Sequence, residues 1–226
     1  MPLAEWNKLI ADLTARAEGN DAQAQWELGS LLDGGLLDRR GESFAVKPNQ
    51  RVAIRWFRRS AQAGNASGQV SLGNYLAAGR ATERDEDEAI FWYKRAVRQS
   101  DSSGAVNIAC VYNRRQDQRR AFFWYQRAAA MDDGGALLEV GVRYYEGRGV
   151  MRDPKRAVGC FRKAIQSGNI SQAGREMAMF WLGRAYREGC GVRQSNAQAI
   201  EWLSKANCDD DIPAARRLID EIRREG

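Results

Sequence analysis

One short block occurs five times along this chain, and the repetition limits the folds open to it. Each copy follows the pattern A-x-x-[WC]-[FYL]-x-[RK]-[AS], and successive copies begin 36, 32, 36 and 42 residues apart. The copies occupy residues 53–60, 89–96, 121–128, 157–164 and 199–206. A period of this length is the signature of repeat architectures, in which each unit packs mainly on its neighbours.

A second block, A-x-x-x-[LIV]-[GA]-x-x-[YL], lies before each copy of the first, and some copies begin with Gly in place of Ala. The conserved offsets of both blocks fall on one face of an α-helix, so each repeat is predicted to be a pair of helices, A then B. The Gly or Ala at the sixth position of this block lowers the helix propensity by up to about 1 kcal/mol. We expect an aromatic residue of helix B, such as Trp92 or Tyr93, to need that space. The second block begins at Ala24, Gly68, Gly104, Ala136 and Ala178.

Turn and cap residues agree with this division. Gly-Asn pairs stand where helix B is expected to end and the next helix A to begin, with a left-handed Gly and a capping Asn. They are Gly19-Asn20, Gly64-Asn65 and Gly168-Asn169. Asp153-Pro154 and Ser195-Asn196 predict the starts of two B helices. Because a lone pair cannot bury its apolar stripe, the pairs must stack, with a first helix over 6–17 and a last helix over 212–224.

The residues of the clearest unit, 136–168, run through Val140-Gly141, Tyr144-Tyr145, the loop EGRGV, Asp153-Pro154 and FRKAI. This pattern resembles the Sel1-like repeat family, a relative of the tetratricopeptide repeats. The predicted fold is therefore all-α: a right-handed superhelical α-solenoid of stacked antiparallel helix pairs with N- and C-terminal capping helices.

The chain is predicted to be one domain, 1–226, with local departures from the family pattern. Its third repeat has Asn113-Arg114-Arg115-Gln116 in place of the Gly-x-Gly loop. The first repeat carries a long connector at 35–49. We interpret it as a loop insertion folded onto that repeat or as a clamp on the groove. The fifth is extended at 170–176. The predicted repeats are about 20–64, 65–100, 101–132, 133–168 and 169–208, followed by a capping helix at about 212–224.

The resemblance implies a scaffold or adaptor whose inner curve, lined by the A helices, holds a protein or peptide. Some bacterial members are regulators, secretion-associated factors or immunity proteins that block a toxin, which is the alternative interpretation. A cysteine-rich subgroup is a poor match, because the cysteines of this chain do not recur with the repeat.

A helical wheel places three positions of each A helix opposite its buried face. The position three before the Gly/Ala is apolar in every unit: Trp26, Val70, Val106, Leu138 and Phe180. Such a file suits a peptide laid along a groove, or it packs against the next A helix as core, and both interpretations stay open here. The predicted partner-binding residues are Trp26, Asn74, Asn113, Tyr145, Phe180, Arg184 and Arg187.

The sequence lacks residues and motifs that common catalytic sites need. The chain contains no histidine, which excludes a Ser-His-Asp triad, a Cys-His pair and a His metal ligand. Nucleophile, P-loop and dinucleotide motifs are also missing. We expect no enzyme, no cofactor and no metal.

Charge and cysteine usage complete the expectations. The net charge of +6 favours anionic partners, but acidic residues are interspersed and Arg doublets are scattered, so an RNA-binding array ranks below a protein binder. Cys110, Cys160, Cys190 and Cys208 form no C-x-x-C pair and are interpreted as buried thiols of a reducing compartment. The N-terminus as given lacks a signal peptide, so a cytoplasmic monomer without a membrane span is expected.

Overall fold

The computed structural model divides the chain into two compact units, residues 1–111 and 112–226, and the boundary lies inside helix α6 (Ser102–Arg114). The described residues are 3–37, 44–207 and 212–225. Among them, no helix combines the length and the apolar character needed to cross a lipid bilayer. The predicted single domain and its repeat boundaries stay predictions.

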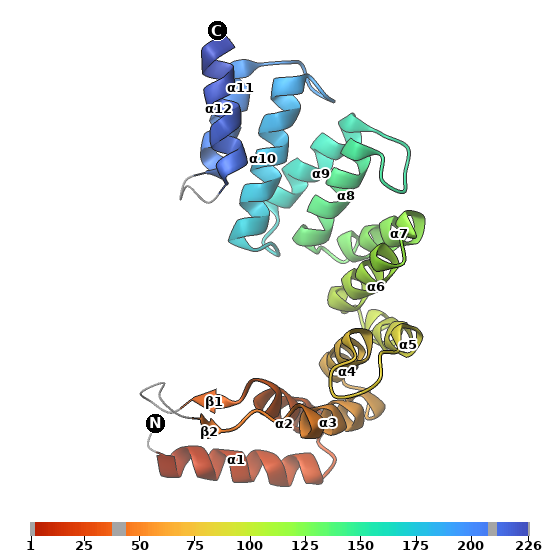
Figure 1. The fold of residues 1–226 in the computed structure, drawn as a ribbon. Helices are drawn as coiled ribbons and strands as arrows, with labels where there is room; N and C mark the ends of the chain where they lie inside the picture. Colours follow the sequence, from red (N-terminus) through yellow and green to blue (C-terminus); the bar gives the residue numbers. More distant parts are fainter. Residues whose placement is uncertain (1–2, 38–43, 208–211, 226) are drawn as a thin grey trace. The chain divides into compact units, whose positions relative to one another are not determined.

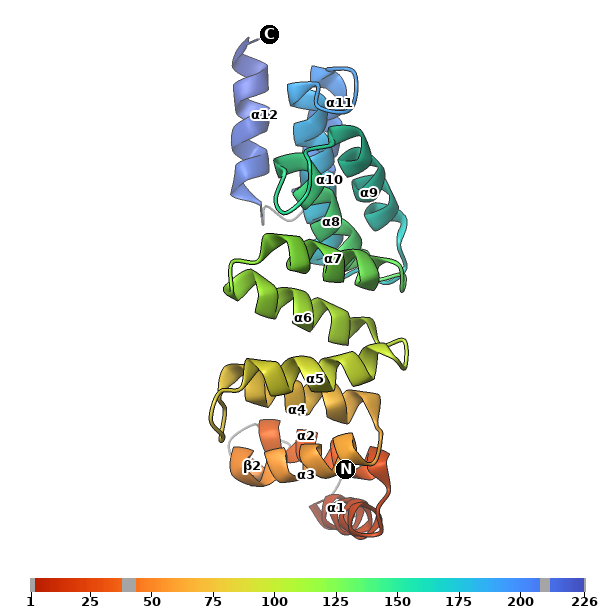
Figure 2. The same cartoon turned by 90° about the vertical axis from the view of Figure 1, so that its right-hand side faces the viewer.

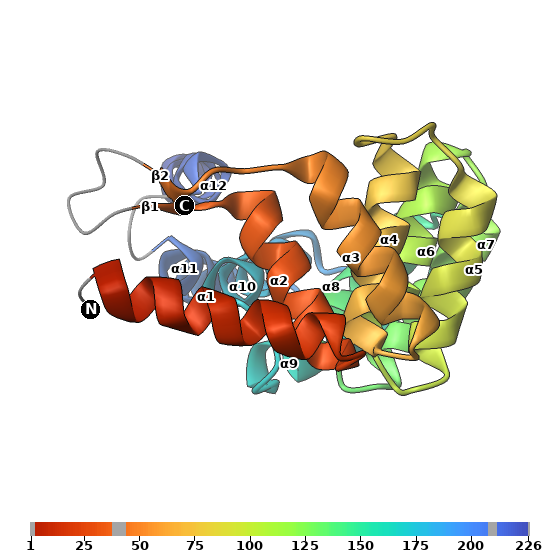
Figure 3. The same ribbon diagram turned by 90° about the horizontal axis from the view of Figure 1, so that it is seen from below.

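The first unit is a row of helices in chain order (Figure 1). Its elements before α6 are α1 (Leu3–Glu18), α2 (Ala22–Gly34), β1 (Leu36–Leu37), β2 (Phe44–Val46), α3 (Gln50–Gln62), α4 (Ala66–Ala78) and α5 (Glu86–Val97). The A helix α2 packs on the B helix α3 of its own repeat, α4 packs on α5 in the same way, and α3 also contacts α4. The view from below shows α1 alongside α2 (Figure 3), so the predicted first helix is present.

The second unit continues the same arrangement after α6. Its elements are α7 (Gln118–Ala129), α8 (Gly134–Glu146), α9 (Pro154–Gln166), α10 (Gln172–Glu188), α11 (Asn196–Ala206) and α12 (Pro213–Glu225). α8, α9 and α10 lie side by side (Figures 1 and 2), and the two A helices α8 and α10 contact each other directly. α12 packs on α11 and buries Ala215, Ile219 and Ile222. The predicted architecture of stacked helix pairs with an added helix at each end is confirmed.

In the four repeats whose helix A carries Gly at this position, that Gly receives one ring or branched side chain of helix B. An added Cβ at Gly73 of α4 would stand 2.4 Å from Tyr93 of α5, and one at Gly141 of α8 would stand 2.6 Å from Phe161 of α9. These close contacts agree with the prediction that the small residue of helix A leaves space for a large side chain of helix B. The occupant is the second member of the pair, Tyr93, rather than its neighbour Trp92.

Two of the predicted cap sites of the B helices are occupied as expected. Asp153 accepts a hydrogen bond from the backbone N–H of Arg156, with Pro154 in the first turn of α9. Ser195 accepts from the N–H of Gln198 at the start of α11. These caps satisfy N–H groups that have no partner inside the helix.

The Gly-Asn pairs behave less uniformly than predicted. Asn65 caps α4, but the other two pairs do not cap the next A helix. The N-cap of α2 is Asp21, whose carboxylate accepts two backbone N–H bonds, while Asn20 itself takes the left-handed conformation at φ 66°. Ser171 caps α10, because the inserted residues before that helix displace its start.

The long connector after α2 contains a short antiparallel β-ribbon, which the sequence did not predict. In its register Leu36 pairs with Val46 and Leu37 with Phe44. Its far end returns the chain to α2, where the N–H of Asn49 donates to the carbonyl of Leu32 at 2.6 Å.

The cysteines are less enclosed than expected. Cys110, Cys160 and Cys190 are half-buried thiols rather than fully buried ones, and burial raises the pKa of the Cys160 thiol. Cys208 lies outside the described residues.

Candidate functional site

The predicted apolar file on the A helices lies between neighbouring helices. The indole Nε1 of Trp26 on α2 donates to Ser71 Oγ on α4 at 3.1 Å, and Trp26 is half-buried. Leu138 is 9% exposed, and Phe180 packs on the cluster built by α11 and α12. These contacts favour the core interpretation of the file, and the role of Trp26 and Phe180 in partner binding stays a prediction.

Asn74 forms a polar junction within the first unit. Its Oδ1 accepts from the hydroxyl of Tyr93 at 2.8 Å and from Nδ2 of Asn107 on α6 at 3.0 Å. The same amide therefore ties helix A to its own helix B and to the next helix A.

Both polar atoms of the Asn113 side-chain amide form hydrogen bonds within the second unit. Its Nδ2 donates to the Tyr125 hydroxyl at 3.2 Å, and its Oδ1 accepts from Arg143 at 2.6 Å. Arg143 is 1% exposed, also donates to Gln118 at 3.0 Å, and places its guanidinium 4.9 Å from the Tyr125 ring centre. Burial lowers the pKa of Arg143. This junction occupies the place where the third repeat lacks its Gly-x-Gly loop, and it makes Asn113 first of all a packing residue.

Two other predicted residues, Tyr145 on α8 and Arg184 on α10, meet in one pocket of the second unit. We call it the Tyr145 pocket; its volume is about 330 Å³ and it is lined by Tyr145, Glu146, Arg152, Arg184 and Glu188. The Tyr145 hydroxyl donates to Glu188 Oε2 at 2.7 Å, and Arg184 Nε donates to Glu188 Oε1 at 2.6 Å. One carboxylate thus orients both predicted residues.

Two further aromatic rings, Trp181 and Phe161, pack against the lining residue Tyr145. Trp181 stacks on Phe161 at 6.1 Å with 18° between the planes and meets Tyr145 edge-on at 5.5 Å. The Arg184 guanidinium carbon lies 5.2 Å from the Trp181 ring centre and 5.8 Å from that of Tyr145. Attraction between a cation and these rings adds to the ion pair in holding Arg184 in place.

Arg152, from the loop between α8 and α9, supports the pocket from the side. Its Nε donates to the backbone carbonyl of Tyr145 at 2.9 Å, and its Nη2 contacts Cys190 Sγ at 3.4 Å. The loop is therefore fastened to α8 and to the segment that directly follows α10.

The electrostatics of the pocket keep its charged groups ionised. Burial alone would raise the pKa of Glu188, but the hydrogen bonds from Tyr145 and Arg184 outweigh it and hold that pKa below its usual value. The hydrogen bond to Glu188 raises the pKa of Arg184, and burial together with the bond to Glu188 raises the pKa of Tyr145. The ion pair is therefore complete at neutral pH.

Replacing Glu188 with glutamine is expected to lower the thermal midpoint modestly at pH 7, with a difference that shrinks as the pH falls through the acid range. A carboxylate with a lowered native pKa adds stability that is present above its unfolded pKa and is lost as the pH falls through the native value. Because Glu188 remains 35% exposed, the effect at pH 7 is expected to stay within about 1 kcal/mol. Thermal melts of both proteins between pH 3 and 7 measure it, and a difference independent of pH would contradict the assignment.

Arg187 is one turn further along α10 and lies outside the Tyr145 pocket. It forms an ion pair with Glu225 of α12 and contacts Asn196 Oδ1 at 3.5 Å. The two arginines that were predicted together are thus separated, one in the pocket and one fastening the last helix.

Sequence reasoning missed three residues that shape these sites: Arg143, Arg152 and Trp181. Each acts through a partner on another helix or loop and carries no periodic signal. Across the residues that the structure describes, no group of three or more Cys, Asp or Glu is arranged to hold a metal ion.

Comparison with known proteins shows which family the chain resembles in sequence. The family model described as Sel1 repeat matches five segments that together cover most of the chain: residues 22–65, 66–101, 112–133, 135–169 and 176–211.

Solved structures agree on the fold. A protective antigen of uropathogenic Escherichia coli, c5321, with an SLR fold, is 26% identical with a TM-score of 0.78; the match covers 96% of this chain and 44% of the E. coli chain. The present chain thus spans less than half the length of that protein. A Sel1 repeat protein from Oxalobacter formigenes is 24% identical with a TM-score of 0.73, over 94% of this chain and 86% of that one. An immunity protein from Pseudomonas aeruginosa, Pa5087, is 16% identical with a TM-score of 0.50, over 96% and 74% of the two chains. With most of its residues matched by the family model, the chain belongs to the Sel1 repeat family.

Proposed function

We propose that the protein is a non-catalytic interaction scaffold that holds a protein or peptide partner on the A helices of its second unit, with the Tyr145 pocket as the anchor point. The observation that carries the proposal is the fixed position of Arg184. Its Nε is engaged by Glu188 and its plane lies near two rings, while its two Nη atoms make no hydrogen bond to any described residue.

A guanidinium held in this way is ready to receive a carboxylate or a backbone carbonyl of a partner. Ordering a flexible side chain on association costs about 0.5–1.5 kcal/mol, and here the fold has already ordered Arg184, Tyr145 and Glu188. Glu146 at the edge of the pocket is exposed and forms an ion pair with Arg148 through Oε2 at 2.7 Å, and its Oε1 offers an acceptor for a basic group of the same partner. The pocket therefore suits a polar anchor residue of a peptide or of a protein surface.

Affinity capture from the source cells with Arg184→Glu and wild-type baits at equal salt tests this proposal. We expect at least one protein to be retained by the wild type and lost from the variant, because the reversed charge repels the anchor. Arg217→Glu is the matched control, since Arg217 is exposed on α12 and the charge change is the same. The predicted contribution of Arg187 is measured with Arg187→Glu in the same series.

Stability separates binding from folding in that experiment. The Arg184–Glu188 pair is partly exposed, at 40% and 35%, so its loss is expected to cost no more than about 1 kcal/mol. A variant that keeps its helicity and loses the partner supports the proposal. Unchanged capture by Arg184→Glu would contradict it.

A protein that neutralises a toxin or another enzyme is the second candidate. The solved structure of the Pseudomonas aeruginosa immunity protein shares the fold, although at 16% identity the likeness extends to the fold alone. This version requires a folded enzyme as partner in a tight one-to-one complex. Sedimentation of the captured pair distinguishes it from an adaptor that binds a peptide segment.

A further inference from the structure

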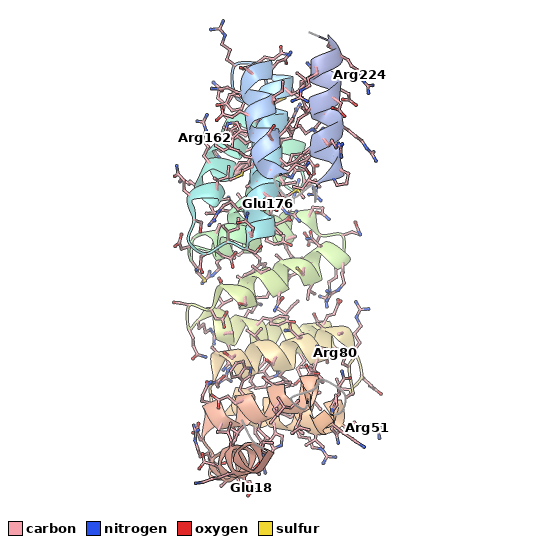
Figure 4. All side chains as sticks on the ribbon, turned by 90° about the vertical axis from the view of Figure 1, so that its left-hand side faces the viewer. Glu18, Arg51, Arg80, Arg162, Glu176 and Arg224 are labelled. Carbon is pink, nitrogen blue, oxygen red and sulfur yellow. The ribbon has the colours of Figure 1, made fainter. Side chains whose placement is uncertain are left out.

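The second unit has another pocket, which we call the Arg162 pocket, at the junction of α9, α10 and the start of α11. Its volume is about 610 Å³, and its polar lining includes Arg162, Tyr186, Arg193, Ser195 and Gln198. No residue of this lining belongs to the Tyr145 pocket. Figure 4 labels Arg162, whose exposed side chain lies on the surface of the unit beside α9.

Both arginines of this pocket lack a carboxylate partner among the described residues. Arg162 Nη2 donates to the Tyr186 hydroxyl at 2.9 Å, and Arg193 makes no hydrogen bond or ion pair there. Arg156, six residues earlier on α9, contacts the hydroxyl of Tyr144, which holds the position of Tyr186 in the preceding repeat, at 3.4 Å. Arg156 differs from Arg162 because it forms an ion pair with Asp153 at 3.2 Å. The Arg162 pocket is therefore a concentration of uncompensated positive charge.

The two hydroxyl groups of the pocket also keep their hydrogens available for a ligand. The Tyr186 oxygen already accepts from Arg162, and the Ser195 oxygen accepts from the N–H of Gln198 at 3.3 Å. Neither hydroxyl donates to a described residue, so both hydroxyl hydrogens remain for a ligand. A pocket that offers two guanidinium groups and two O–H donors, with no acidic residue in its lining, matches a ligand made of acceptors.

We propose that the Arg162 pocket binds a phosphate group carried by a larger molecule. A phosphate presents several charged acceptor oxygens, which suit the forked donors of arginine. The pocket is far larger than one phosphate group, and Val192 adds an apolar wall for the organic part of the ligand. This site is independent of the scaffold function proposed for the Tyr145 pocket.

Isothermal titration calorimetry at low ionic strength with three probes tests this site: inorganic phosphate, glycerol 3-phosphate and a short peptide containing phosphoserine. We expect Arg162→Gln and Arg193→Gln each to weaken binding by about tenfold or more, because each removes a charged hydrogen bond to the phosphate. Tighter binding of the peptide or of glycerol 3-phosphate than of inorganic phosphate supports a phosphate carried by a larger molecule and identifies its source. Equal or tighter binding of inorganic phosphate would overturn the claim that the phosphate is carried by a larger molecule.

Arg156→Gln is the matched control, because it removes one positive charge from the same helix outside the pocket. Binding that survives in this variant and fails in the two pocket variants supports the site. Equal weakening in all three would mean attraction to general surface charge and would overturn it, as would the absence of binding by all three probes at millimolar concentration. A Tyr186→Phe variant provides a second readout, since it removes one donor without changing the charge.

Discussion

Replacing Phe161 with alanine is expected to lower the free energy of unfolding by about 3 to 5 kcal/mol, the usual range for a fully buried phenylalanine. Its side chain is 0% exposed. The ring fills the space that Gly141 leaves on α8 and stacks on Trp181 of α10. One ring therefore joins α9 to both A helices of the second unit, and the cavity left by its removal cannot close without moving them.

Phe123 on α7 is the matched control for this experiment. It is the same residue type on another B helix of the same unit, but it is 54% exposed. We expect Phe123→Ala to cost less than about 1 kcal/mol. Urea denaturation followed by circular dichroism compares the two variants, and similar losses would contradict the packing described for α8, α9 and α10.

Gly149→Ala is the second large effect, with an expected cost of about 2 to 5 kcal/mol. Gly149 has φ +74°, where a residue with a Cβ loses roughly 1–2 kcal/mol. The new Cβ would also stand 2.1 Å from the carbonyl oxygen of Gln118 at the start of α7. Because that atom belongs to the backbone, relief requires the loop to move away from α7, which adds the usual 1–3 kcal/mol of overpacking.

Gly159→Ala provides a control of opposite sign. Gly159 lies inside α9, and an added Cβ there meets nothing within 4 Å. Alanine is expected to stabilise the helix by about 0.5–1 kcal/mol relative to glycine. Denaturation curves of the two variants should therefore move in opposite directions, and a shift in the same direction would contradict the close contact between this loop and α7.

The parts of the fold that follow from periodicity were predictable from the sequence. The offsets of small and apolar residues placed the helix pairs, and the Gly or Ala of each A helix indicated that a large side chain packs there. The pattern did not show which member of the aromatic pair packs there. Successive side chains on a helix point about 100° apart, so Tyr125 is buried against Arg143 of α8 while Trp124 is turned aside and half-buried.

The candidate site was predictable only in part. Tyr145 and Arg184 were found because they occupy repeated positions of the A helices. Arg143 is different, since its partner Asn113 is 30 residues away and no repeat position encodes the pair. The separation of Arg187 from Arg184 has the same origin, because its partner Glu225 lies on a helix outside the repeats.

The β-ribbon after α2 was missed for a related reason. Its two strands have only two and three residues, too few to show the alternation by which a strand is recognised in a sequence.

Site-specific crosslinking from the Tyr145 pocket tests the central claim most directly. A photoreactive amino acid placed at Glu146, on the rim of the pocket, is compared in the source cells with the same group at Arg223, an exposed position of α12. We predict one defined protein adduct from position 146 that disappears when Arg184→Glu is added, and no such adduct from position 223. The same adducts from both positions, or an adduct at position 146 that survives Arg184→Glu, would contradict a partner anchored in this pocket.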